Sequence, residues 1–171
     1  MAIVAVYQLQ KAGYLGWVTA DHYHDMGKFL FGFSIFWAYI GVSQYLLIWY
    51  ANLPEEITYY LQRQNPGWVW FTVLLPLVRF VLPFLLLLPR MAKRTPSYLV
   101  KVAGLVVFGA WLDLYWMIMP NFSTNRFGFS YLYDVGLLVG FAGLLIFWVR
   151  RFLSAHNTLP VKDPFLHEAM H

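Results

Sequence analysis

Four long apolar runs constrain this chain more than any other feature of its sequence. They are residues 29–51, 68–88, 102–119 and 127–149. A helix needs about 20 mostly apolar residues to cross a bilayer, whereas a helix in water needs a polar face, which these runs lack. The runs therefore predict an all-α, polytopic transmembrane bundle with four spans, at about 29–51, 68–88, 97–119 and 129–151.

The composition supports this prediction and limits the chemistry of the chain. Sixty per cent of the residues are hydrophobic and only 12% are charged, against about a quarter charged in a soluble domain. The length predicts a single membrane domain over residues 1–171. The absence of cysteine excludes disulfides, thiolate-bound clusters and Cys-ligated zinc within this chain. The basic residues are scattered between apolar runs, which indicates topology rather than a nucleic-acid-binding patch. The expected partners of such a chain include lipid and no nucleic acid.

The distribution of Lys and Arg predicts how the chain is oriented. Nine of them flank the ends of the spans on the side of both termini, and two, Arg63 and Arg126, lie on the other side. Positive loops stay in the cytoplasm, so both termini are expected there, with a cytoplasmic tail at 156–171. Residues 1–12 are apolar but too short to span. We expect them to be the tail of a preceding helix, and the chain to be part of a longer subunit.

The connection after the first span contains two adjacent carboxylates. In the stretch LIWYANLPEEITYY, Asn52 is predicted to cap a short interfacial helix, with Pro54 in its first turn. Glu55 and Glu56 then complement the positive end of the helix dipole. Helix capping thus explains both glutamates without assigning them a role in proton transfer.

A polar stretch, DHYHDMGK at residues 21–28, precedes the first span. His24 and Asp25 are candidates for a proton-entry site, and the alternative is that the stretch only caps the span. His22 and His24 lack the spacing of a helical metal pair, so no metal site is predicted. Because no histidine lies inside a span, no haem site is expected, and this chain is predicted to hold no redox cofactor.

The ionisable residues inside the spans are the main functional candidates. A charge near the bilayer centre costs about 2.5–3.5 kcal/mol and usually faces a partner or a cavity. Arg79 and Asp113 lie in consecutive spans at depths that a long side chain can bridge, which predicts an ion pair. Its role is either proton or quinol handling, or structural neutralisation. The remaining candidates for proton or quinone contact are Gln44, Asp134 and Tyr115. Two prolines, Pro76 and Pro83, predict a distorted second span.

A longer stretch resembles a known family. The residues HDMGKFLFGFSIFWAYIGVSQYLLIWYANLPEEITYY, 24–60, and the tail VKDPFLHEAMH, 161–171, are similar to the C-terminal part of an NrfD/polysulphide-reductase-like membrane subunit of alternative complex III. The resemblance implies a bacterial inner-membrane quinol:cytochrome c oxidoreductase in which this chain supports assembly and is a candidate for quinone binding or proton conduction. It also implies a second NrfD-like subunit, an iron–sulfur subunit and c-type cytochromes as partners, which carry the clusters and haem c. The alternatives are a transporter or channel fragment and a purely structural anchor.

Overall fold

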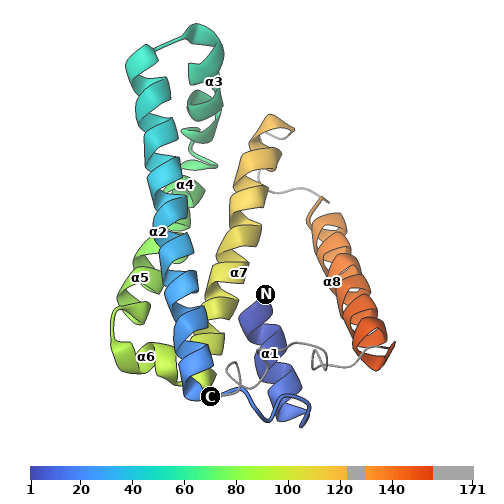
Figure 1. Ribbon diagram of the computed structural model, residues 1–171. Coiled ribbons are helices and arrows are strands. Elements are labelled where there is room, and N and C mark those ends of the chain that lie inside the picture. Colours follow the sequence, from blue (N-terminus) through green and yellow to red (C-terminus); the bar gives the residue numbers. More distant parts are fainter. Residues whose placement is uncertain (123–129, 156–171) are drawn as a thin grey trace.

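The computed structural model describes residues 1–122 and 130–155, except for the side chains of 130–132 and 134. Every regular element within these residues is helical (Figure 1). In chain order they are α1 (Ala2–Lys11), α2 (Ala20–Ala51), α3 (Pro54–Arg63), α4 (Val69–Pro76), the π-helix η1 (Leu77–Val81), α5 (Leu82–Leu87), α6 (Arg90–Arg94), α7 (Pro96–Ile118), the 3₁₀ turn η2 (Met119–Asn121) and α8 (Ser130–Ala155).

Four of these helical stretches are long and apolar enough to cross a membrane. They are Ala20–Ala51, Val69–Leu87, Pro96–Asn121 and Val135–Ala155. The predicted all-helical fold with four spans and a further short helix is therefore confirmed. The expected cytoplasmic tail at 156–171 lies outside the described residues.

The first span begins earlier than its apolar run. Thr19 is the N-cap of α2, and its backbone N–H donates to Nδ1 of His22 at 3.2 Å. The polar stretch at 21–28 therefore forms the first turns of the helix. At 32 residues, α2 is about 48 Å long, which exceeds the roughly 30 Å of a hydrocarbon core. Its polar turns therefore extend beyond that core or the helix tilts.

The prediction that Asn52 caps the following helix is wrong. Asn52 instead ends α2 in the left-handed conformation, with φ at 49°, and its backbone N–H donates to the carbonyl of Ile48. Asparagine tolerates this conformation better than most residues. Leu53 takes the N-cap position of α3, while Pro54 opens that helix and Glu55 and Glu56 lie in its first turn, as predicted.

The predicted distortion of the second span is confirmed. The chain continues from α4 through η1 into α5, and the backbone N–H of Leu82 donates to the carbonyl of Leu77, five residues back. Pro76 and Pro83 lie just outside the π turn, and neither has a backbone N–H to continue the regular pattern. The widened turn accommodates this local break in the α-helical hydrogen bonds.

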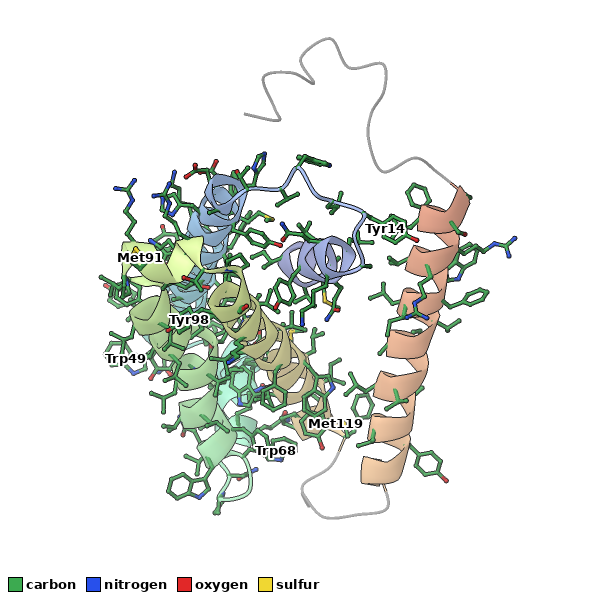
Figure 2. All side chains as sticks on the ribbon, turned by 90° about the horizontal axis from the view of Figure 1, so that it is seen from below. Tyr14, Trp49, Trp68, Met91, Tyr98 and Met119 are labelled. Carbon is green, nitrogen blue, oxygen red and sulfur yellow. The ribbon has the colours of Figure 1, made fainter. Side chains whose placement is uncertain are left out.

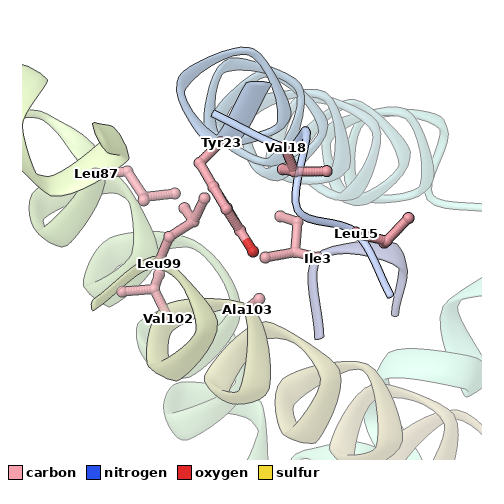
Figure 3. Packing of buried hydrophobic residues seen from close by; sticks show 8 residues of the cluster. All are labelled: Ile3, Leu15, Val18, Tyr23, Leu87, Leu99, Val102 and Ala103. Carbon is pink, nitrogen blue, oxygen red and sulfur yellow. The ribbon is translucent and has the colours of Figure 1, made fainter. Parts of the chain in front are cut away.

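The main hydrophobic core lies at one end of the bundle, where α1, α2, α5 and α7 meet (Figure 3). Its buried members are Ile3, Leu15, Val18, Tyr23, Leu87, Leu99, Val102 and Ala103. The Tyr23 hydroxyl donates to Oε1 of Gln10 at 2.6 Å, and Nε2 of Gln10 donates to the carbonyl of Val18 at 2.9 Å. These bonds satisfy the hydroxyl of Tyr23, which the core encloses.

The last helix lies apart from the rest. Both views place α8 away from α2, α4 and α5, with open space beside it (Figures 1 and 2). Its apolar side chains are exposed along its length, from Val135 to Phe152. In a bilayer, lipid or another membrane helix would cover these side chains.

Candidate functional site

The predicted ion pair between the second and third spans is present. Nε of Arg79, in η1, lies 3.5 Å from Oδ2 of Asp113, in α7. Both side chains remain partly open, at 20% and 27% exposure. The structure thus confirms the predicted pairing, and it places the pair at the edge of the described bundle rather than deep inside it.

A third helix contributes a residue that the sequence did not single out. Trp37, in α2, donates its indole N–H to Oδ2 of Asp113 at 2.9 Å. The guanidinium of Arg79 lies 5.0 Å from the centre of the same indole ring, within range of a cation–π interaction. Asp113 therefore accepts a hydrogen bond from Trp37 of α2 and forms an ion pair with Arg79 of η1.

The backbone approaches closely at this site. A Cβ atom added to Gly109 of α7 would lie 3.4 Å from both Cα and Cβ of Arg79. A small cluster of Leu75, Val78 and Leu112 fills the adjoining space. The missing side chain at Gly109 lets α7 lie against η1, which brings the two charges together.

The opposite charges of Arg79 and Asp113 compensate each other, but the guanidinium does not use all of its hydrogen-bond donors. Among the described residues, Nη1 of Arg79 is buried and has no hydrogen-bond partner. A buried donor without a partner costs about 1–3 kcal/mol. The site therefore combines a carboxylate acceptor, Asp113, with a buried guanidinium donor that has no partner among the described residues.

A second arginine forms a different centre at the far end of α7, and sequence reasoning assigned it no role. Arg63 is fully buried. It donates to the carbonyls of Tyr59 and Met117 at 2.6 Å and to that of Trp116 at 3.3 Å. The last carbonyls of a helix lack partners within the helix, so Arg63 caps the C-terminus of α7 with a positive charge.

Aromatic side chains enclose this second arginine. Its guanidinium lies 3.4 Å from the centre of the Tyr59 ring and 5.0 Å from that of Trp116. Burial lowers the pKa of Arg63 and raises the pKa of Tyr59. Arginine nevertheless stays protonated because its ordinary pKa lies far above neutral pH. Trp116 also donates to the hydroxyl of Thr72 at 2.9 Å, which ties α7 to α4.

The other predicted site residues lie elsewhere. Gln44 is exposed on α2, and Tyr115 packs among aromatic rings, with centroids 5.7 Å from Trp111 and 6.0 Å from Trp68. Asp134 lies in α8, but its side chain is outside the described residues. Among the candidates within the spans whose side chains the structure describes, Arg79 and Asp113 are the two that it brings into contact.

The polar stretch at the start of α2 forms a separate cluster with α6. Asp25 pairs with Lys28 at 2.9 Å, and Asp21 forms an ion pair with Arg94. His24 is half-buried nearby, and its Nδ1 has no hydrogen-bond partner among the described residues. Across all the residues that the structure describes, no group of three His, Asp or Glu side chains lies close enough together to hold a metal ion.

Comparisons with known protein families and with curated proteins find no match. The structure itself establishes that the regular elements of the described residues are helices. Four helical stretches have the length and hydropathy of membrane spans, and an ion pair joins two of them.

Proposed function

We propose that this protein is an integral membrane subunit of a quinol-oxidising electron-transfer complex of the alternative complex III type. The redox centres, haem c and iron–sulfur clusters, belong to its partners in this proposal. The resemblance of residues 24–60 supports the family, and the four candidate spans support a place within the membrane part of the complex.

The partly exposed Arg79–Asp113 pair is the observation that carries a role beyond anchoring. Membrane-embedded charges usually face a partner, a cavity or a proton pathway. A pair that served only to neutralise two charges would be best enclosed, because exposure to lipid is costly. The exposed part of this pair thus favours a neighbouring protein surface or a hydrated path.

The chemistry of the pair suits proton or quinol handling. A quinol releases protons when it is oxidised, and a carboxylate such as Asp113 can receive one. Protonation would remove the charge that compensates Arg79. The guanidinium could then turn so that Nη1, which is buried in the pair, binds a quinone carbonyl or a carboxylate. The second candidate role is structural, and the bond from Trp37 to Asp113 favours it, because that bond holds the carboxylate in one orientation.

The proposed location is the bacterial inner membrane with both termini in the cytoplasm. The cationic helix α6 lies at the same end as α1 and the start of α2, while α3 lies at the opposite end (Figure 1). Cysteine labelling of Thr58→Cys, in α3, tests this orientation. Labelling only by reagents on the cytoplasmic side would contradict it.

The deciding experiment is purification of the assembled protein with its partners, followed by quinol:cytochrome c turnover. We expect c-type haem and iron–sulfur clusters to co-purify, and Asp113→Asn to assemble but lose most turnover. Turnover near that of the wild type in the assembled Asp113→Asn complex would leave the pair a structural role. Purification without any redox partner would favour the transporter alternative and contradict the proposed complex.

A further inference from the structure

We propose that the cluster where α6 crosses the start of α2 binds the headgroup of an anionic phospholipid. The cluster comprises Lys28 of α2 and Arg90, Lys93 and Arg94 of α6, together with His24 of α2. The crossing is close, because a Cβ atom added to Gly27 would lie 3.0 Å from Cβ of Lys93. This proposal rests on the local geometry and does not depend on the redox function.

The cluster has more positive than negative charge. Four cations face two carboxylates: Asp25 pairs with Lys28, and Asp21 pairs with Arg94. Arg90 is exposed and forms no ion pair among the described residues. Lys93 lies 4.8 Å from the centre of the Phe31 ring and likewise has no carboxylate in the described part of the chain. Two positive charges therefore remain available to an anion.

Two nitrogen atoms in the cluster lack partners within the protein. In the described part of the chain, Nδ1 of His24 and Nε of Arg94 are buried without a hydrogen bond. His24 lies within electrostatic range of Arg90, Arg94 and Lys28. Because the Arg94 side chain is 38% exposed, its guanidinium can turn outward. A phosphate oxygen would then accept from Nε, and from His24 in the tautomer that protonates Nδ1.

The surroundings select a lipid over a free anion. Leu88 and Met91, on either side of Arg90, are 53% and 73% exposed, and Phe29, next to Lys28, is 69% exposed. Met91 lies at the outer side of α6 (Figure 2). Charged and exposed apolar side chains thus alternate at the end of two membrane spans, where an acyl chain can lie along the helices while its phosphate meets the cations.

The test uses the protein in nanodiscs of phosphatidylcholine with a minor share of phosphatidylglycerol, and native mass spectrometry to count the lipids that stay bound. We expect phosphatidylglycerol to be retained over phosphatidylcholine. Retention should fall about fivefold in Arg90→Gln and about 25-fold in Arg90→Gln/Arg94→Gln, from roughly 1 kcal/mol per cation near an anionic headgroup. Arg90→Gln breaks no ion pair of the described residues, so it remains informative if the double variant unfolds.

Matched variants separate a site from general charge. Arg150→Gln/Arg151→Gln removes the same charge from α8 and should leave retention unchanged. Asp21→Asn removes the carboxylate that competes for Arg94 and should raise retention, whereas a merely structural ion pair would give no gain. Equal retention of the two lipids, equal loss in both double variants, or displacement by inorganic phosphate at constant ionic strength would overturn the proposal.

Discussion

Two arginines pack against α7 in opposite ways. Arg63 is fully buried, and its partners are backbone carbonyls, two of them from the last turns of α7. Arg79 is partly exposed, and its partner is a carboxylate. Each also has an aromatic ring beside its guanidinium, Tyr59 in one case and Trp37 in the other.

The difference between them concerns which charges can change. Backbone carbonyls do not titrate, so the three hydrogen-bond acceptors of Arg63 stay uncharged at every pH, and its role is to hold α3 to the end of α7. Arg79 instead faces the side-chain carboxylate of Asp113, whose charge is not fixed by backbone chemistry. We infer that the first centre fixes the fold and that the second is the one suited to a functional cycle.

The largest effect is expected from Arg63→Gln. This change removes the charge and leaves buried carbonyls without their donor, at about 1.5–3 kcal/mol for each charged hydrogen bond. For three such bonds, the free energy of unfolding should fall by about 5 kcal/mol, measured by far-UV circular dichroism during titration with sodium dodecyl sulfate. Arg63→Lys should recover only part of this loss because an ammonium group cannot reach the same three carbonyls. Wild-type stability in Arg63→Gln would contradict the capping role.

A smaller and non-additive effect is expected at the other centre. Arg79→Gln and Asp113→Asn should each lower the free energy of unfolding by about 2–3 kcal/mol, because each leaves one charge uncompensated in a low-dielectric region. The double variant should lose less than the sum of the two. Strictly additive losses in the same titration would mean that the 3.5 Å contact carries no coupling, and the comparison between the two arginines would then fail.

The contribution of the tryptophan can be isolated by Trp37→Phe. Phenylalanine keeps an aromatic ring near Arg79 but removes the indole N–H that donates to Asp113. We expect the free energy of unfolding to fall by about 1 kcal/mol, the usual contribution of one hydrogen bond. Trp49→Phe, at an exposed position of the same helix, is the matched control. Equal effects of the two changes would indicate that the bond to Asp113 contributes nothing.

The smallest effect is expected from Glu55→Gln combined with Glu56→Gln. These carboxylates lie in the first turn of α3, where they complement the helix dipole. Since α3 carries Arg63 at its other end, a slightly less stable α3 should lower the unfolding midpoint by a small amount and leave turnover of the assembled complex near normal. Loss of turnover without loss of assembly would assign the glutamates a direct role in proton transfer.

The sequence predicted what depends on local composition. The spans follow from apolar runs, the break in the second span from Pro76 and Pro83, and the pairing of Arg79 with Asp113 from two isolated charges in consecutive spans. Each of these features can be recognised within one or two segments, because hydropathy and backbone chemistry act locally.

Other features depend on how the helices are rotated against one another. Trp37 lies in a charge-free run among several aromatic residues, and nothing in its neighbourhood distinguishes it as the partner of Asp113. The partners of Arg63 are backbone carbonyls, which every residue has, so no pattern of side chains indicates them. Asn52 suits both a helix start and a left-handed helix end, and the choice between these is made by where α2 stops.

The π turn also sets the phase of the second span. Before η1 along the chain, Leu75 of α4 packs against Leu112. After η1, Leu87 of α5 packs in the main core with Leu99. Over the interval from Leu75 to Leu87, a regular α-helix turning about 100° per residue would place the two leucines about 120° apart. One additional residue taken up by the π turn reduces this angle to about 20°. A single span can thus present apolar side chains to α7 along both of its halves, with Arg79 at the point where the phase is corrected.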